Sequence, residues 1–407
     1  MRYDLVFEGG GAKGMAFVGA LRAFEAAGHT VGRLVGTSAG AITATVLAAG
    51  YNAAEMAAAL NETAGDQPVF ATFLGDPAAP ADPTAGALAE LLREVDLSFV
   101  PDWAEERLDE RLLDALGHNA NGRRLLSFFD YGGFFAADAL PAWLARKLDE
   151  GTTADGRPRR FGSMTLAEMH RATGVALSLT ASDVTHGRLR ILNYRTAPDV
   201  PVVWAARMSM SVPLLWQEVV WRAEWGGYYG RGAGESEAVA LAGAVMVDGG
   251  LLSNFPIELL VSREERVRGI MGPDAAEGVL GFLIDERLPV AGAPAAPAGR
   301  AAPALGKLGS LRTVRRLAAL VDTVTQARDK MVIEENRGRV VRLPAAGYGT
   351  TEFGMSDARR LALIAAAEAA TVAYLDQAAG GLESLETLST AESDRIALEE
   401  LGIGNQE

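Results

Sequence analysis

Three glycine-framed segments surround one serine that could act as a nucleophile. They are residues 9–14 (Gly-Gly-Gly-Ala-Lys-Gly), 36–40 (Gly-Thr-Ser-Ala-Gly) and 248–250 (Asp-Gly-Gly). The middle segment has the G-x-S-x-G pattern, which places a serine hydroxyl on a sharp turn from strand to helix, where it can attack an ester carbonyl. The chain holds 46 glycines, so the argument rests on the set of three. Together they predict a serine acyl hydrolase.

The surroundings of Ser38 fit a nucleophile elbow. The apolar residues 33–35 precede it, and residues 39–49 favour a helix that Gly50 would end. Glycines on either side lack the side chains that would clash in so tight a turn. The plainer alternative is a serine that only caps a helix. We therefore predict that the elbow consists of Gly36, Thr37, Ser38, Ala39 and Gly40.

The first glycine segment has two possible functions. Gly9, Gly11 and Gly14 satisfy the dinucleotide pattern G-x-G-x-x-G, but that pattern requires an acidic residue at the end of the second strand, and this strand leads to Gly36. The alternative is a nest of backbone amides that binds an oxyanion. We predict an oxyanion hole from Gly9, Gly10, Gly11, Ala12, Lys13 and Gly14.

A serine nucleophile needs a base, and the chain offers only four histidines: His29, His118, His170 and His186. The order Ser, Asp or Glu, His of the α/β-hydrolases would need a histidine late in the chain, and none follows His186. His186 lies at the expected tip of a hairpin between strands 177–182 and 188–193, where side chains are usually exposed. It remains the best histidine alternative.

Asp248 is the other candidate base. It follows the apolar strand 244–247 and precedes Gly249 and Gly250. Open α/β sheets build their sites at the carboxyl ends of strands, where this carboxylate would lie.

These motifs resemble those of the patatin-like phospholipases, namely G-G-G-x-[Arg or Lys]-G, G-x-S-x-G and D-G-[Gly or Ala]. Residues 209–213 and 254–256 are also similar, as are residues 349–353 with the helix after them, which resemble the closing strand and helix of the family. The resemblance covers residues 1–376. It implies a three-layer α/β/α fold with a mainly parallel sheet, and a Ser38–Asp248 dyad with an acyl-serine intermediate. It also implies an oxyanion hole around Gly10 and Gly11, a phospholipid or lysophospholipid substrate, and no metal or organic cofactor.

The order of predicted elements suggests how the site is built. Strand and helix patterns alternate over residues 1–60, which is typical of a parallel sheet covered on both faces. Residues 61–165 break that pattern, and we predict a helical insertion that caps the site. Further predictions are a mobile Ala/Pro/Gly-rich loop at 287–310, helices at 311–335 and 356–377, and an acidic tail at 377–407.

Composition narrows the classes of function. The 38 basic and 52 acidic residues give a net charge of −14, which argues against nucleic acid as a partner. There is no cysteine. We see no apolar segment of signal-peptide type and no apolar run long enough to span a membrane. We therefore expect a cytoplasmic protein with at most peripheral membrane contact, and signal-less secretion stays open. The oligomeric state is not predicted.

The insertion raises two further alternatives. Phe128, Phe129, Phe134 and Phe135 could contact lipid as part of a lid or pack in a core. The pairs Arg123–Arg124 and Arg159–Arg160 could meet lipid phosphates, but in so acidic a chain we expect them to be solvated or salt-bridged.

Two other functions of the protein also stay open. One is a dinucleotide-binding oxidoreductase that uses Gly9, Gly11 and Gly14, and the other is a non-catalytic lipid-binding module on the same fold.

Overall fold

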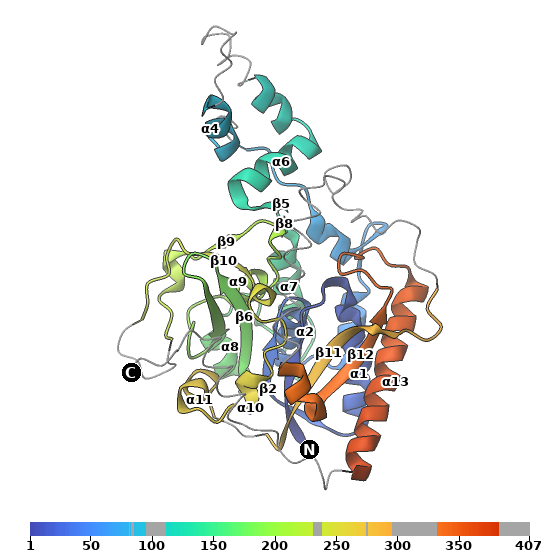
Figure 1. The fold of residues 1–407 in the computed structure, drawn as a ribbon. Helices are drawn as coiled ribbons and strands as arrows, with labels where there is room; N and C mark the ends of the chain where they lie inside the picture. Colours follow the sequence, from blue (N-terminus) through green and yellow to red (C-terminus); the bar gives the residue numbers. More distant parts are fainter. Residues whose placement is uncertain are drawn as a thin grey trace.

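The computed structural model describes residues 1–80, 82, 85–94, 111–230, 238–273, 276–294 and 332–381 (Figure 1). Its centre is one mixed sheet with the strand order β12-β11-β1-β2-β6-β10-β9, and β7 pairs with β6. The strands are β1 (Arg2–Phe7), β2 (Thr30–Gly36), β6 (Leu177–Asp183), β7 (Arg188–Asn193), β9 (Val219–Val220), β10 (Val245–Asp248), β11 (Gly278–Pro289) and β12 (Val340–Ala346).

The sheet is mainly parallel, as predicted. The pairs from β12 through β11, β1 and β2 to β6 are all parallel, whereas β7, β10 and β9 add antiparallel pairs at the β6 side. The carboxyl ends of β1 and β2 therefore meet at one edge of the sheet, where the two glycine turns follow them.

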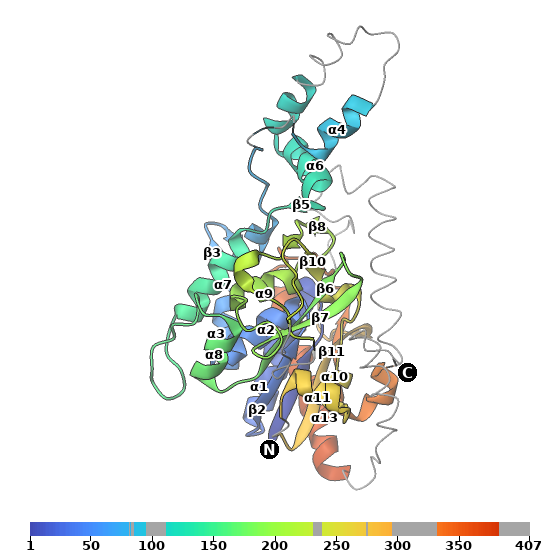
Figure 2. The same cartoon turned by 90° about the vertical axis from the view of Figure 1, so that its left-hand side faces the viewer.

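Helices cover both faces, which confirms the three-layer fold (Figures 1 and 2). Successive side chains of a strand point to opposite faces. In β1, Leu5 and Phe7 belong to a large core, whereas Val6 belongs to a second, smaller one. The large core includes side chains of α1 (Ala16–Ala26), α2 (Ala39–Ala48), α3 (Ala53–Leu60), α8 (Leu166–Thr173), α9 (Val202–Ser209) and α13 (Asp357–Gly381). The smaller core includes side chains of α10 (Glu258–Val261) and α11 (Glu265–Met271).

The predicted insertion, residues 61–165, has two structurally different parts. Its helices α4 (Ala87–Glu94) and α6 (Ala120–Tyr131) project from the body, at the top of Figures 1 and 2, around a small core of their own. In contrast, η2 (Val69–Leu74), β5 (Gly133–Phe135) and α7 (Ala139–Asp149) contribute to the large core of the body, and β5 pairs with β8 (Leu214–Trp216). Much of the segment is therefore part of the body.

The four phenylalanines have different environments. Phe134 and Phe135 are only 2% and 1% exposed, so the lipid-contact hypothesis is wrong for these two. Phe128 stacks on Phe134 with ring centroids 4.6 Å apart. Phe129 is 40% exposed, and its neighbour Tyr131 is 57% exposed. Exposed apolar side chains of the projecting part therefore lie on α6, and Leu91 of α4 and Leu112 are exposed too.

The C-terminal part corrects one expected strand. Residues 349–353 form a turn, and the closing strand is β12, which lies earlier in the chain. The helix predicted from residue 356 is α13. By length and composition alone, α13 could cross a membrane, contrary to our expectation; its Leu363 and Ile364 are buried in the large core. Residues 95–110, 295–331 and 382–407 lie outside the described residues. They include most of the predicted loop, most of the helix predicted at 311–335 and most of the predicted acidic tail.

Candidate active site

Ser38 lies in a strained turn between β2 and α2. Its φ is 54° and its ψ is −119°, a backbone conformation that residues other than glycine rarely adopt. The hydroxyl makes no hydrogen bond that caps α2, so the helix-cap alternative is not supported. A Cβ on Gly40 would lie 2.2 Å from the carbonyl oxygen of Phe7. The glycine therefore allows the elbow to pack against the end of β1.

Asp248 is held at the end of β10. Its amide donates to the carbonyl of Ser211 over 2.9 Å, and its Oδ1 accepts from the amide of Gly250 over 2.7 Å. Its Oδ2 is buried and has no hydrogen-bond partner within the described residues. Burial raises the pKa of Asp248 to about 7, and the nearby Ser38 hydroxyl and the Gly250 amide offset that effect only in part.

This environment suits a general base. Catalysis by proton transfer is most efficient when the pKa of the base lies near the working pH. Ser38 and Asp248 are 5% and 4% exposed, so little water competes for the serine proton. No hydrogen bond of ordinary length joins the two side chains, and such contacts often tighten only when substrate binds.

The glycine loop offers two unused amides. The amide of Gly9 donates to the carbonyl of Asn254 over 3.2 Å, and that of Ala12 donates to the carbonyl of Thr350 over 2.8 Å. The amide of Lys13 donates to the carbonyl of Gly10 over 3.1 Å. Within the described part of the chain, the amides of Gly10 and Gly11 have no acceptor. Of the six residues predicted to form an oxyanion hole, Gly10 and Gly11 are therefore the two whose amides remain available as donors.

The other members of the loop hold it against the elbow. A Cβ on Gly9 would lie 3.0 Å from the Cβ of Ser38, and one on Gly14 would lie 2.9 Å from the Cβ of Ala39. The Lys13 side chain is buried and forms a salt bridge with Glu286. These residues therefore fix the distance between the free amides and the nucleophile.

A cavity of about 620 Å³ brings the predicted residues together. Ser38, Asp248 and the glycines 9–11 line it. Its lining also includes charged residues that the sequence analysis missed, namely Glu8, Asp285, Glu286, Arg287, Glu334 and Arg342. Three of them, residues 285–287, directly follow the apolar residues of β11. Charged residues after an apolar run were therefore the sequence signal that could have identified them.

A second, apolar pocket lies beside the elbow. It shares Gly11 with the large cavity and includes Ala39. Its other apolar side chains come from distant parts of the chain, which is why sequence reasoning did not find them: Met15, Ile42, Leu60, Phe70, Met210, Trp216, Phe353 and Met355.

None of the four histidines, all of which are described, lines the large cavity. His186 lies at the tip of the β6–β7 hairpin, where we expected it, and its Nδ1 lies 2.8 Å from Oδ2 of Asp183. Among the described residues, no three His, Asp or Glu side chains are arranged to hold a metal ion.

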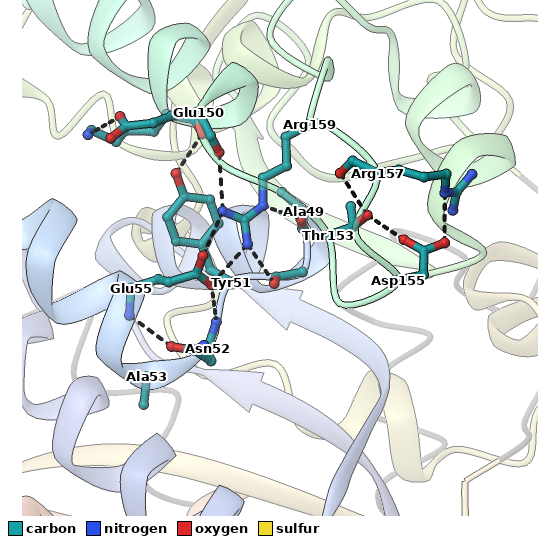
Figure 3. Close-up of polar contacts among 12 residues, drawn as sticks. Ala49, Tyr51, Asn52, Ala53, Glu55, Glu150, Thr153, Asp155, Arg157 and Arg159 are labelled. Carbon is teal, nitrogen blue, oxygen red and sulfur yellow. Dashed lines mark hydrogen bonds and ion pairs between the residues drawn. The ribbon is translucent and has the colours of Figure 1, made fainter.

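The far end of α2 is fixed by a buried arginine (Figure 3). Arg159 donates to the carbonyls of Ala49 and Gly50 over 3.0 and 2.8 Å and to both carboxylate oxygens of Glu55 over 3.1 and 2.9 Å. Its guanidinium also lies over the ring of Tyr51, 3.9 Å from the centroid. A cation at the carboxyl end of a helix is favourable. The helix that carries Ser38 at its start is thus anchored at its end.

The elbow and the glycine loop follow the carboxyl ends of β2 and β1, and Asp248, at the end of the antiparallel strand β10, lines the same cavity. A strand, a G-x-S-x-G turn and a helix in this order are typical of hydrolases. The family model for patatin-like phospholipase matches residues 5–261. The chain therefore belongs to the patatin-like phospholipase family, whose members are lipid acyl hydrolases. The dinucleotide-binding hypothesis is not supported.

Individual relatives are more distant. The chain is 26% identical over 384 residues to a Bacillus subtilis (strain 168) protein called uncharacterized protein YqhO, covering 93% of this chain and 99% of that protein. The solved structure of VipD from Legionella pneumophila is 17% identical, with a TM-score of 0.44, over 92% of this chain and 67% of VipD. The type III effector ExoU of Pseudomonas aeruginosa is 18% identical, with a TM-score of 0.38, over 92% of this chain and 53% of ExoU. Because both TM-scores lie below 0.5, these two structures carry no argument about the function of this chain.

Proposed function

We propose that this protein hydrolyses carboxylic esters of glycerophospholipids or lysophospholipids through a Ser38–Asp248 dyad. The observation that carries the proposal is the burial of both side chains in one cavity, where the pKa of Asp248 is raised to about 7 beside two unused amides. That arrangement supplies a nucleophile, a base and oxyanion donors without a histidine.

The reaction proceeds in two steps. Asp248 takes the proton of the Ser38 hydroxyl as the oxygen attacks the ester carbonyl, and the amides of Gly10 and Gly11 donate to the resulting oxyanion. When the intermediate collapses, the ester C–O bond breaks and protonated Asp248 returns the proton to the leaving alcohol. Asp248 then deprotonates a water molecule as its oxygen attacks the carbonyl of the acyl-serine. The bond between the acyl carbon and Oγ of Ser38 breaks, Asp248 returns the proton to Oγ, and a fatty acid is released.

The two cavities suit the two ends of a lipid. The apolar pocket beside the elbow has a volume of about 40 Å³ and is lined by Ala39, so an acyl chain bound at Ser38 would enter it only if the pocket widened. The large cavity is lined by charged residues, among which Arg287 and Arg342 share the buried carboxylate of Asp285 and Arg342 also lies 3.7 Å from Glu334. The guanidinium groups are donors that could bind a phosphate. A glycerophospholipid combines these features.

Membrane contact belongs to the same proposal. The N terminus, where β1 starts, lies at the bottom of Figure 1, so the carboxyl ends of β1 and β2 face the projecting helices α4 and α6. The exposed Phe129 and Tyr131 on α6 therefore lie on the side of the molecule where a lipid would enter.

The test combines labelling with product analysis. A fluorophosphonate should label Ser38, and incubation with mixed phospholipid vesicles should release a free fatty acid and a lysophospholipid, identified by mass spectrometry. The Ser38→Ala variant should do neither. Lipid binding with neither labelling of Ser38 nor fatty-acid release would instead favour the non-catalytic lipid-binding module.

A further inference from the structure

Asn254 contacts both turns that flank the candidate nucleophile. It follows β10 by a few residues and lines the large cavity. Its carbonyl accepts from the amide of Gly9 over 3.2 Å, and its Nδ2 donates to the carbonyl of Gly9 over 3.0 Å. Nδ2 also donates to Oε1 of Glu8 over 3.2 Å. One residue thus binds both sides of the Gly9 backbone.

The orientation of this side-chain amide follows from its neighbours. A backbone carbonyl and a carboxylate oxygen can only accept hydrogen bonds. The Gly9 carbonyl and Oε1 of Glu8 lie beside the same side-chain atom of Asn254, so that atom must be the amide nitrogen. Glu8 is fixed in turn, because its Oε2 accepts from the amide of Ile284 in β11 over 2.6 Å.

The hydrogen bond to Gly9 sets the direction of the next amide. The carbonyl of Gly9 and the N–H of Gly10 belong to one planar trans peptide group, so they point in opposite directions. When Nδ2 of Asn254 holds that carbonyl, it also fixes the N–H of Gly10. This amide is one of the two without an acceptor in the described part of the chain.

The same side chain contacts the aspartate turn. A Cβ on Gly250 would lie 2.7 Å from Oδ1 of Asn254, and one on Gly9 would lie 2.1 Å from it. Gly250 is the residue whose amide donates to Oδ1 of Asp248. Asn254 therefore packs between the oxyanion loop and the turn that holds the base.

We propose that Asn254 is a positioning residue for acyl transfer. It aims the Gly10 amide at the oxyanion and sets the spacing between that amide and Asp248. The inference rests on the proposed serine-hydrolase function, and it adds a residue outside the three glycine-framed segments.

The test compares two variants with the native enzyme on a soluble p-nitrophenyl ester. Asn254→Ala should lower kcat about 10- to 100-fold, somewhat less than the direct loss of an oxyanion donor, with KM changed by less than about twofold. Asn254→Asp keeps the shape of the side chain but removes the donor, so its kcat should fall at least as far. Rates are expressed per Ser38 site titrated with a fluorophosphonate, so partly unfolded material does not count.

A pH profile separates positioning from simple loss of structure. The Asn254→Asp variant adds a negative charge beside the Asp248 turn, which raises the pKa of Asp248. The acidic limb of kcat/KM should therefore move to higher pH in that variant and stay in place in Asn254→Ala. Leu252→Ala is the matched control, because Leu252 packs against the smaller core; it should lower the melting temperature and leave kcat per site unchanged.

The outcomes are distinguishable. If the native enzyme is active but both Asn254 variants keep kcat within about threefold of native, the positioning role is wrong and the proposed function stands. A kcat loss in Leu252→Ala equal to that in the Asn254 variants would also overturn it. If the native enzyme neither turns over the ester nor reacts at Ser38, the proposed function fails, and the role of Asn254 fails with it.

Discussion

In the proposed mechanism, Ser38 and Asp248 act on one proton, so their contributions to the rate cannot be independent. We expect Ser38→Ala and Asp248→Asn each to remove nearly all esterase activity, and the double variant to lose little more, because either change alone abolishes the attack. Turnover of a p-nitrophenyl ester, measured on folded protein, checks this. The control is His186→Ala, which should keep most activity; a loss as large as that of Ser38→Ala would contradict the dyad.

The buried carboxylate also links activity to pH. A base must be deprotonated to act, and the pKa of Asp248 is raised to about 7. We therefore expect kcat/KM to fall as the pH drops below about 7. A profile that stays flat down to pH 5 would show that the base titrates in the ordinary range of an aspartate.

The same pKa predicts a stability cost at neutral pH. Asp248 has a higher pKa in the folded state than the ordinary 3.8, so the folded state binds the proton more tightly and loses stability as pH rises from about 4 through about 7. Asp248→Asn removes that cost. The variant should be inactive and yet more stable than native at pH 8, by up to about 4 kcal/mol, the equivalent of a three-unit shift. Denaturant unfolding at pH 5 and pH 8 measures this, and the gain should shrink at pH 5.

At the scale of elements, the position of Ser38 depends on both ends of α2. Its start is the strained elbow, and its end is held by Arg159 (Figure 3). Arg159 is buried, whereas the adjacent Arg160 is exposed. The pair therefore provides a matched comparison.

We expect Arg159→Ala to destabilise the fold by about 2 kcal/mol or more, because the carbonyls of Ala49 and Gly50 and the Glu55 carboxylate lose their partner. Arg160→Ala should change stability by less than about 0.5 kcal/mol. Thermal and urea unfolding test both. Equal effects of the two variants would mean that the buried contacts add nothing to stability.

The projecting helix α6 permits a sharper test of membrane contact than the phenylalanines of β5. Because Phe134 and Phe135 are buried, replacing them would mainly unfold the body. We expect Phe129→Ser combined with Tyr131→Ser to lower activity on phospholipid vesicles several-fold and to leave a soluble ester unaffected, since apolar side chains at a lipid surface contribute to binding.

The control for that test is Val372→Ser, which removes an exposed apolar side chain from α13 in the body. Its vesicle activity should equal that of the native enzyme. Equal losses on vesicles and on the soluble ester in the α6 variant would show that α6 supports the fold and does not contact lipid.

At the scale of the whole molecule, the site lies where two cavities meet. The large cavity has charged walls and the adjacent pocket is apolar, and the elbow and Gly11 lie at their junction. A phospholipid is divided in the same way, because its ester bond joins a part with a polar headgroup to an apolar acyl chain. The helices α4 and α6 project from the body at the top of Figure 2, on the side opposite the N terminus. In the proposed function, a lipid would approach the site from that side.

The sequence alone determined what is local. The elbow around Ser38, the hairpin at His186 and the helices α2 and α13 follow from residue spacing over a few turns, so their patterns predicted them. The mainly parallel sheet followed from the alternation of strands and helices. The order of the three motifs was enough to indicate the family, because each requires particular residues in a short segment.

Only the tertiary structure decided what depends on distant neighbours. The raised pKa of Asp248 comes from burial by segments far away in the chain, and Asn254 and Thr350 determine which amides of the glycine loop remain unused. In the sequence, Phe134 and Phe135 could face lipid or pack in a core, and in the structure, where β5 pairs with β8, both are buried. A pattern records which side chains are apolar, but folding determines whether protein, water or lipid covers them.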